Sequence, residues 1–245
     1  MEYTLLHSLN DTIRLRNLFQ TFKQELHGKF DLYENFDYES WGNTMAPGSM
    51  PANPLLQKIV EQEDPTIIVE VGSFLGYSAC GMSTVLKEKK KNAIVICIDT
   101  WMGGLDGWKD AINEQKLYKI NKKNGYPTFY YNFLANVCYA GMQDYIIPLA
   151  FPSTIASKIL NEVFASLNVK ADMIYIDGSH MAEDVYLDCC NYYPLVKPNG
   201  LLFGDDYQAD DVKQGIKMFI DKDITKTKRL EVFQNQVHWQ IRKNE

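Results

Sequence analysis

The chain has 245 residues and a mass of 28.2 kDa, with 46% hydrophobic and 23% charged residues, values that are ordinary for a globular domain of an enzyme. This composition argues against a disordered, collagen-like or disulfide-stapled chain. The 31 acidic residues outnumber the 25 basic ones, so the net charge is −6. An acidic chain is a poor partner for nucleic-acid phosphates, and a small or neutral substrate fits better.

The lack of a recognisable targeting signal and the pattern of the cysteines both favour the cytoplasm. No window approaches ~18 consecutive apolar residues, and the N-terminal stretch lacks the basic and long apolar regions of a signal peptide. The five cysteines, two of them adjacent, match neither a disulfide framework nor a metal site. We therefore predict a cytoplasmic protein with reduced thiols and no membrane partner.

The first 52 residues are predicted to form an N-terminal extension. Apolar residues recur at helical spacing from Thr12 to His27. Residues 28–52 then carry aromatic side chains among Gly, Pro and Asn without a sustained period, which predicts an ordered aromatic loop or lid. Closure over a substrate and a purely structural aromatic cluster both fit this composition. The main domain is predicted to span residues 53–245 and to open with a helix that Asn53 caps.

From residue 54 onward, strand and helix patterns alternate, which is typical of a parallel sheet covered by helices on both faces. The predicted strands are short, rich in β-branched residues and nearly all apolar: 66–71, 93–98, 145–149, 172–177 and 200–204. Helical patterns fill the intervals at 77–90, 110–121, 128–140, 153–167, 181–193 and 209–221. The last strand-like segments lie too close together for a crossover helix, which predicts an antiparallel hairpin of 229–233 and 237–241.

A glycine-containing turn follows the first predicted strand. Gly72 and Gly76 stand between that strand and the next helix, where a missing side chain lets the backbone approach a ligand. The spacing differs from the G-x-G-x-x-G of dinucleotide-binding proteins, and a tight turn with positive φ is the alternative. The second strand ends in Asp99, 27 residues after Gly72, where a carboxylate can accept hydrogen bonds from both ribose hydroxyls of a nucleoside. The two signals together predict a nucleoside site.

These residues resemble the motif of the class I S-adenosylmethionine-dependent methyltransferases, whose first strand carries E-x-G-x-x-x-G and whose second strand ends in a ribose-binding acid. The resemblance covers about residues 54–242. It implies a Rossmann-like α/β fold with a seven-stranded, mostly parallel sheet, helices on both faces and a C-terminal antiparallel hairpin. It also implies S-adenosylmethionine as the cofactor, bound by the five residues that match the motif: Glu70, Gly72, Ser73, Gly76 and Asp99.

Four further residues become candidates for the cofactor site through the same resemblance. Thr100 and Trp101 follow the ribose acid. Ser153 and Thr154 stand in a loop like the one that contacts the adenine in the family. Ser153 is equally well placed to cap a helix, and the indole of Trp101 is as consistent with packing of its loop as with covering the adenine.

Carboxylates follow two more predicted strands. Asp177 ends one of them, and Asp205 and Asp206 come directly after the next. Because the carboxyl ends of parallel strands share one edge of the sheet, we expect the three side chains to converge beside the cofactor. Three carboxylates repel one another unless a cation lies between them, and all-oxygen ligands suit Mg²⁺, with Mn²⁺ or Ca²⁺ as substitutes. A solvated turn at Asp205 and Asp206 that caps the next helix is the alternative.

This layout resembles the metal-dependent O-methyltransferases of catechol and caffeoyl-coenzyme A type, and more closely the antibiotic-sugar methyltransferases and cephalosporin-hydroxylase-like proteins. By that resemblance Asp177, Asp205 and Asp206 are the metal ligands, and Asp177 also adjoins the cofactor and serves catalysis. His180 stands three residues after Asp177, where catechol-type enzymes carry a lysine base, and an imidazole can accept a hydroxyl proton near neutral pH. A helix-start residue bonded to backbone is the alternative for His180. The other histidines are expected outside the site: His7, His27 and His238.

The predicted function is transfer of a methyl group from S-adenosylmethionine to a hydroxyl of a small molecule or sugar, with Mg²⁺ lowering the pKa of that hydroxyl. Sugar, glycoside and catechol-like acceptors all fit. The alternatives are a metal-dependent hydroxylase and a non-catalytic S-adenosylmethionine-binding module. A non-haem iron site normally needs two histidines and a carboxylate, whereas a single histidine is expected here. Related enzymes are often homo-oligomers, and the resemblance implies the same for this chain.

Overall fold

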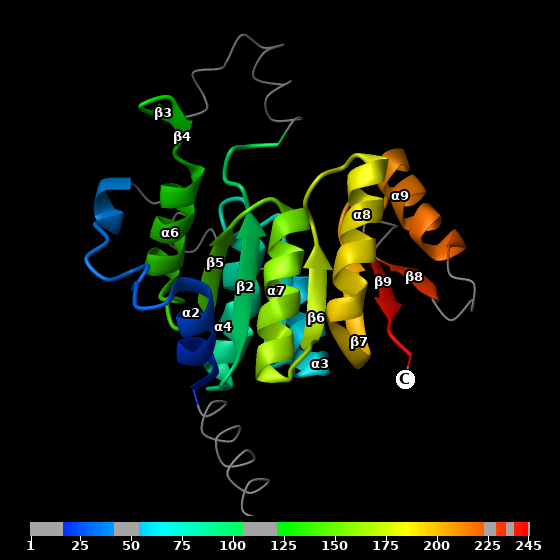
Figure 1. Cartoon of the computed structure of the whole chain (residues 1–245), viewed down its shortest axis with the longest axis horizontal. Coiled ribbons are helices and arrows are strands. Elements are labelled where there is room, and N and C mark those ends of the chain that lie inside the picture. Colours follow the sequence, from blue (N-terminus) through cyan, green and yellow to red (C-terminus); the bar gives the residue numbers. More distant parts are fainter. Residues whose placement is uncertain (1–16, 42–53, 105–121, 223–228, 234–237, 245) are drawn as a thin grey trace, which may run out of the picture.

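The computed structural model describes residues 17–41, 54–104, 122–222, 229–233 and 238–244. In this part of the chain, a seven-stranded sheet lies between two layers of helices (Figure 1). The strand order is β5-β2-β1-β6-β7-β9-β8. The strands have the following bounds: β1 (Ile67–Val71), β2 (Ile94–Asp99), β5 (Ile146–Ala150), β6 (Ala171–Ile176), β7 (Val196–Gly204), β8 (Leu230–Phe233) and β9 (His238–Arg242).

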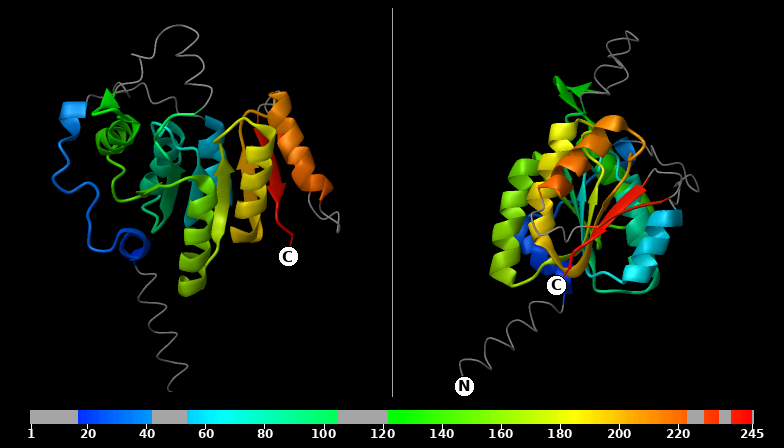
Figure 2. Two further views of the ribbon diagram at one scale, coloured as in Figure 1. Left: turned by 45° about the horizontal axis from the view of Figure 1, so that its top comes forward. Right: turned by 90° about the vertical axis from the view of Figure 1, so that its right-hand side faces the viewer.

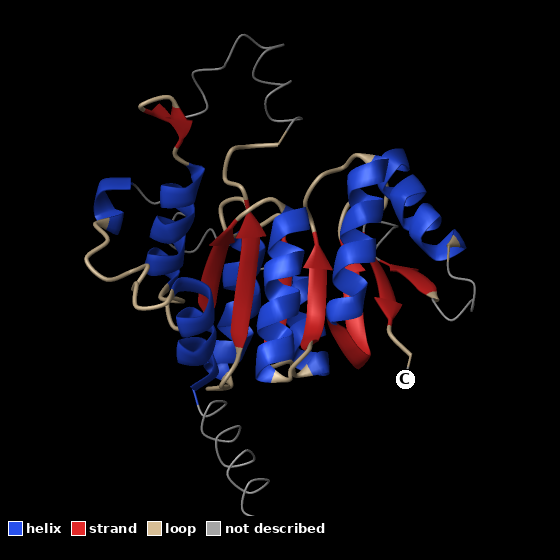
Figure 3. Cartoon of the chain, viewed as in Figure 1, coloured by secondary structure: helices blue, strands red, loops and turns tan. Residues whose placement is uncertain are grey.

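The first five strands in this order, from β5 to β7, are parallel to one another, and β9 runs antiparallel to both β7 and β8 (Figure 3). The Rossmann-like α/β class, the seven-stranded sheet and the C-terminal hairpin predicted from sequence are thereby confirmed. A second, two-stranded sheet of β3 (Lys122–Lys123) and β4 (Tyr126–Pro127) was not predicted. Its strands are too short to produce a periodic pattern.

Helices cover both faces of the large sheet, as Figure 2 shows in the view along the sheet. One hydrophobic core joins the sheet to α2 (Leu18–His27), α7 (Ser153–Leu167), α8 (Ala182–Tyr192) and α9 (Asp210–Asp221). The other core lies under α3 (Pro54–Glu63), α4 (Tyr77–Glu88) and α6 (Phe129–Ala140). Short 3-10 turns at Tyr38–Trp41 (η2) and Tyr193–Leu195 (η4) complete the described elements. The predicted helix at 110–121 and the start of the first predicted helix lie outside the described residues.

The central strands are buried on both faces, which explains their continuous apolar sequences. All five residues of β1 are buried, and five of the six residues of β2 are buried as well. A strand between two helical layers presents both of its side-chain rows to a core, so a pattern alternating with solvent does not arise. The carboxyl ends of the parallel strands all reach the same edge of the sheet, and the predicted site residues lie along that edge.

The N-terminal segment covers the β5 edge of the sheet. Helix α2 packs beside β5, where His27 Nε2 donates a hydrogen bond to the carbonyl of Pro148 at 2.8 Å. The hydroxyl of Tyr33 donates to the carbonyl of Ile146 at 3.0 Å. Proline in this edge strand and two side-chain donors on its open carbonyls prevent the edge from pairing with another strand. The N-terminal segment therefore covers the exposed edge of the sheet at β5.

The described part of the aromatic stretch packs against helix α6. The ring of Trp41 stacks on Tyr131 with centroids 4.5 Å apart, and the ring of Tyr38 meets Tyr139 edge-on at 5.0 Å. These contacts favour the structural cluster over the substrate lid for residues 28–41. Residues 42–52 of the same stretch lie outside the described residues.

Replacing Tyr33 by Phe removes the hydroxyl that binds the β5 edge and leaves the ring in place. We expect the free energy of unfolding to fall by about 1 kcal/mol, the usual net value of one hydrogen bond to a carbonyl. Urea denaturation followed by circular dichroism measures it. The matched control is Tyr126→Phe, because Tyr126 is 69% exposed and its hydroxyl should contribute little. Equal stability of the Tyr33→Phe variant and the unmodified protein would contradict a role of the extension in sealing the sheet.

Candidate functional site

The turn after β1 packs directly against the turn after β6. The amide of Asp177 donates to the carbonyl of Val71 at 2.8 Å. A Cβ atom at Gly72 would lie 2.0 Å from the carbonyl oxygen of Asp177, and the φ of Gly72 is +91°, a left-handed value that favours glycine. Only glycine fits this position, so the backbone holds the predicted cofactor turn and the first predicted metal ligand in contact.

The other residues of the first-strand motif face the protein interior. Glu70 is fully buried, and its carboxyl group accepts a hydrogen bond from the hydroxyl of Ser78. Burial raises the pKa of Glu70. Ser73 is also buried, and Gly76 is the capping residue directly before α4, with a φ of +84°. A Cβ atom at Gly76 would lie 3.0 Å from the ring of Phe133, so this glycine has a packing reason of its own.

Asp99 joins the turn after β1 to the turn after β2. Its Oδ2 accepts from the amide of Phe74 at 2.8 Å, and its Oδ1 accepts from the amide of Trp101 at 2.7 Å. Phe74 and Trp101 have φ values of +41° and +51°, so the carboxylate stabilises two residues in left-handed conformations. A carboxylate has about four acceptor positions, and two remain for ribose hydroxyls. Thr100, between Asp99 and Trp101 in sequence, is exposed, and its hydroxyl accepts a hydrogen bond from the amide of Met102.

The indole of Trp101 is only 2% exposed. Its ring contacts Tyr130 and Phe133 at centroid distances of 5.0 and 4.8 Å, and its Nε1 donates to the carbonyl of Phe74 at 2.6 Å. This environment favours the packing interpretation of Trp101: the indole holds the loop in which Asp99 is bound.

Ser153 and Thr154 begin α7 at the end of β5. The capping position before the helix is Pro152, so Ser153 is the first helical residue and not the N-cap. Its carbonyl accepts from the hydroxyl of Tyr192 at 2.7 Å, and its side chain hydrogen-bonds Asp188. Burial raises the pKa of Asp188 to about 6. Thr154 is exposed at the same helix start.

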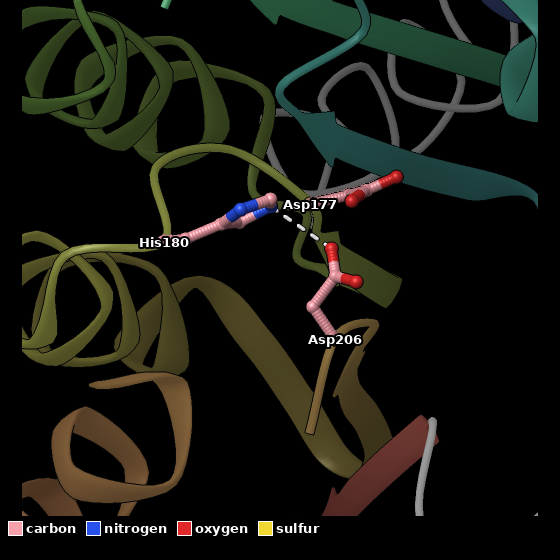
Figure 4. Close-up of side chains that lie close together, drawn as sticks. All are labelled: Asp177, His180 and Asp206. Atoms are coloured by element: carbon pink, nitrogen blue, oxygen red, sulfur yellow. Dashed lines mark ion pairs between the residues drawn. The ribbon is translucent and has the colours of Figure 1, made fainter. Parts of the chain in front are cut away.

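Three side chains gather where β6 and β7 end: Asp177, His180 and Asp206 (Figure 4). One donor atom from each lies within 4.8 Å of the donors of the other two, and His180 Nε2 is 2.9 Å from Asp206 Oδ2. The hollow beside them has a volume of about 10 Å³, room for one water molecule or one ion. The predicted convergence of strand ends thus brings Asp177 and Asp206 together, and it adds the imidazole of His180.

Asp205 is directed differently from Asp206. Its Oδ1 lies 3.1 Å from Nδ1 of His238, a buried histidine at the start of β9. His238 is outside the donor group, as expected, but it contacts one of the predicted metal ligands. The antiparallel register pairs Gly204 with Trp239, and this places His238 opposite Asp205, 33 residues away in sequence. The sequence predicted the hairpin, but the contact follows from the pairing of β9 with β7, which only the structure shows.

The electrostatics of the strand ends are dominated by repulsion among carboxylates. Burial raises the pKa of Asp177, and the negative charges of Asp205, Glu70 and Asp206 raise it further. Asp205 behaves in the opposite way. Burial alone would raise its pKa, but hydrogen bonds from His238 and from the amide of Asp206 bring the pKa below its ordinary value. A charged Asp205 beside a partly buried Asp177 makes the cluster a strong attractor for a cation.

This donor set fits a divalent metal ion. The carboxylates of Asp177 and Asp206, with that of Asp205 in the wall of the same hollow, offer the oxygen ligands that Mg²⁺ and Mn²⁺ bind, and the imidazole of His180 lies beside them. The small hollow has the volume of one ion, and a cation there would relieve the repulsion that raises the pKa of Asp177. Asp177 and Asp206, together with Asp205 from the lining of the same hollow, are the residues that would hold it.

The strand order and the glycine turn after β1 define the chain as a class I S-adenosylmethionine-dependent methyltransferase fold. The family model described as a methyltransferase domain matches residues 69–207, more than half of the chain. The chain belongs to this family, and its enzymatic activity is methyl transfer from S-adenosylmethionine. None of the curated proteins compared with the chain matches it in sequence.

Solved structures share the fold over nearly the whole chain. The O-methyltransferase NovP is 17% identical, with 97% of this chain and 99% of that chain covered and a TM-score of 0.54. An O-methyltransferase from Bacillus cereus in complex with SAH is 15% identical, with 92% and 97% covered and a TM-score of 0.50. Cofactor-bound Rv0187 from MTB is 10% identical, with 93% and 96% covered and a TM-score of 0.54. At such identities the likeness shows the fold.

Among the described helices, none combines the length and apolar character needed to cross a membrane.

Replacing Asp177 by Asn should stabilise the metal-free protein at pH 7 by on the order of 1 kcal/mol, because it removes a partly buried charge from a like-charged cluster. The pKa of this carboxyl is higher in the folded protein than its ordinary value of 3.8. Its contribution therefore favours folding at low pH and is lost as the pH rises above about 4, through the folded-state pKa.

Urea denaturation of metal-stripped protein between pH 5 and 8 measures this effect. The unmodified protein should lose stability with rising pH more steeply than the Asp177→Asn variant. Asp210→Asn is the matched control, because the side chain of Asp210 is fully exposed. A variant less stable than the unmodified protein at pH 7 would show that Asp177 is not under electrostatic strain.

Proposed function

We propose that the protein is an O-methyltransferase that uses S-adenosylmethionine and a divalent metal, most simply Mg²⁺, to methylate a hydroxyl of a small molecule or sugar. The observation that carries the proposal is the contact between the two functional turns. Gly72 of the cofactor turn packs on Asp177 of the acidic cluster, so a methyl donor and a metal-bound hydroxyl would be neighbours. The printed descriptions of NovP and the Bacillus cereus enzyme as O-methyltransferases support the choice of oxygen as acceptor.

The cofactor would lie along the carboxyl edge of β1, β2 and β5. The turn with Gly72, Ser73 and Gly76 would receive its methionine part, with Glu70 stabilising that turn from the interior and Asp177 beside it. Asp99 would accept from the ribose hydroxyls, while Thr100 and Trp101 shape the loop around it. Ser153 and Thr154, at the open end of α7, would border the adenine. The residues proposed for the cofactor are therefore these: Glu70, Gly72, Ser73, Gly76, Asp99, Thr100, Trp101, Ser153, Thr154 and Asp177.

The metal ligands in this proposal are Asp177, Asp205 and Asp206. A bound divalent ion would supply Lewis acidity that makes an acceptor hydroxyl easier to deprotonate. His180 is the proposed base: its ring is 46% exposed, so a hydroxyl proton can pass to the imidazole. Asp206, 2.9 Å from His180 Nε2, would stabilise the imidazolium that forms. The remaining work of the protein is alignment of the sulfonium methyl with the acceptor oxygen.

Oxygen chemistry at a non-haem iron is less well supported. A facial site of two histidines and a carboxylate needs both imidazoles as ligands. The donor group in the described part of the chain contains His180 alone, and the second histidine nearby, His238, contacts Asp205 and is buried. The acceptor class, a cytoplasmic location and an oligomeric assembly stay predictions of the sequence.

Replacing Asp99 by Asn is expected to weaken S-adenosylmethionine binding about tenfold or more, because the charged acceptor for the ribose hydroxyls is lost. Isothermal titration calorimetry with the cofactor measures the dissociation constant. Asp144→Asn is the control, since Asp144 is exposed beside the amino end of β5, away from the proposed site. An unchanged dissociation constant for the Asp99 variant would place the ribose elsewhere.

Replacing His180 by Ala should lower kcat about 100-fold or more at neutral pH, the usual contribution of a general base. Replacing Asp206 by Asn should remove the metal-dependent part of the rate. In both variants the affinity for S-adenosylmethionine should stay within about threefold of the unmodified protein, since neither side chain is proposed to hold the cofactor. Methylation of catechols, polyols and glycosides, with EDTA and then with Mg²⁺ restored, measures these rates.

Asp210→Asn serves as the control for these variants, because Asp210 is a fully exposed aspartate on the following helix. Full activity after metal stripping would remove the metal from the proposal. Cofactor binding without turnover across the whole acceptor panel would favour a binding module instead.

A further inference from the structure

Asp205 is held by more donors than the other carboxylates of the cluster. Its Oδ1 accepts from the amide of Asp206 at 2.8 Å and from His238 Nδ1 at 3.1 Å. Its Oδ2 receives a long contact of 3.4 Å from the hydroxyl of Tyr175. The two contacts to Oδ1 are within ordinary hydrogen-bond lengths, whereas the contact to Oδ2 is beyond them. The carboxylate is therefore oriented through hydrogen bonds to Oδ1, and Oδ2 has only the weak contact with Tyr175.

The position of His238 follows from the sheet. Gly204, the last residue of β7, pairs with Trp239 of β9, so the residue after β7 lies opposite the residue before Trp239. Trp239 Nε1 reinforces this junction by donating to the carbonyl of Asp205 at 3.2 Å. Strand β9 thus hydrogen-bonds both the main-chain carbonyl and the side-chain carboxylate of Asp205.

Within the described part of the chain, His238 does not line the hollow. The side chain is 5% exposed and lies between the end of β7 and the ring of Phe233, at a centroid distance of 5.9 Å. A buried ring of this kind cannot exchange a proton with an acceptor in the hollow. Any influence of His238 on the chemistry must therefore pass through the carboxylate of Asp205.

We propose that His238 is a positioning residue for metal binding: its Nδ1–H holds Oδ1 of Asp205 and leaves Oδ2 as the oxygen that binds the cation. The inference rests on the proposed function in one respect, the assignment of Asp205 as a metal ligand. Groups that hydrogen-bond a ligating carboxylate set its orientation, and their loss typically weakens metal affinity about 10- to 100-fold. The assignment gives a role to a buried histidine that the proposed cofactor site and the proposed base do not use.

Two substitutions at this position separate the hydrogen bond from the packing. His238→Phe keeps a ring of similar size in the buried site and removes the donor. His238→Asn loses the ring but places an amide nitrogen as many bonds from the backbone as Nδ1, so it can still donate to Asp205. A purely structural role would predict that Phe, which preserves volume, is the milder change. The positioning role predicts the reverse for metal affinity.

The experiment is a Mn²⁺ titration of the metal-stripped full-length protein, followed by electron paramagnetic resonance of the free ion. His238→Phe should raise the Mn²⁺ dissociation constant about 10-fold or more, and His238→Asn should stay within about threefold of the unmodified protein. The dissociation constant of S-adenosylmethionine, measured by calorimetry on the same samples, should be unchanged in both variants and shows that they are folded.

The proposal is overturned if the Phe variant binds Mn²⁺ as the unmodified protein does, or if the Asn variant is the weaker of the two. It is also overturned if both variants lose metal and cofactor affinity together, because that is the signature of a structural role. The readout is independent of turnover. Methyl transfer that persists in EDTA contradicts the proposed metal-dependent function, whereas tight Mn²⁺ binding by the Phe variant contradicts the role of His238 alone.

Discussion

The close approach of Gly72 to Asp177 is the constraint on which the rest of the site depends. A single added carbon at Gly72 would overlap the Asp177 carbonyl, so the turn after β1 and the turn after β6 can meet only through glycine. That contact places the cofactor turn and the acidic cluster on neighbouring parallel strands. A transfer reaction gains most from fixed proximity, and here proximity comes from backbone packing and not from flexible side chains.

Repulsion among the carboxylates of the acidic cluster disfavours the charged form of Asp177. Asp177 is pushed toward protonation by burial and by three neighbouring carboxylates at the end of β6, a strand that is buried at five of its six positions. The two histidines beside the cluster are in contrasting environments. His180 is half-exposed and contacts Asp206, whereas His238 is buried and contacts Asp205. One imidazole is thus open to proton exchange, and the other can act only by orienting its partner.

Both outer parts of the sheet are completed by segments distant in sequence. On the β5 side, His27 and Tyr33 occupy the carbonyls of an edge strand that contains a proline. On the other side, β9 brings His238 and Trp239 to the residue after β7. The hairpin that the sequence predicted as a simple edge is therefore part of the site, because antiparallel pairing with β7 starts where the carboxylates begin.

The sequence by itself determined the α/β class, the order of strands and helices, and the set of carboxylates at strand ends, because hydrophobic periodicity and local turn chemistry are written in neighbouring residues. It also indicated the cofactor turn, since glycine spacing and a following acid are local signals. The tertiary structure alone decided which way each side chain points. Asp205 turns to His238, the indole of Trp101 is buried, and Ser153 stands inside its helix and not at its cap. Those outcomes depend on strand register and on packing between segments far apart in the chain, which no local pattern encodes.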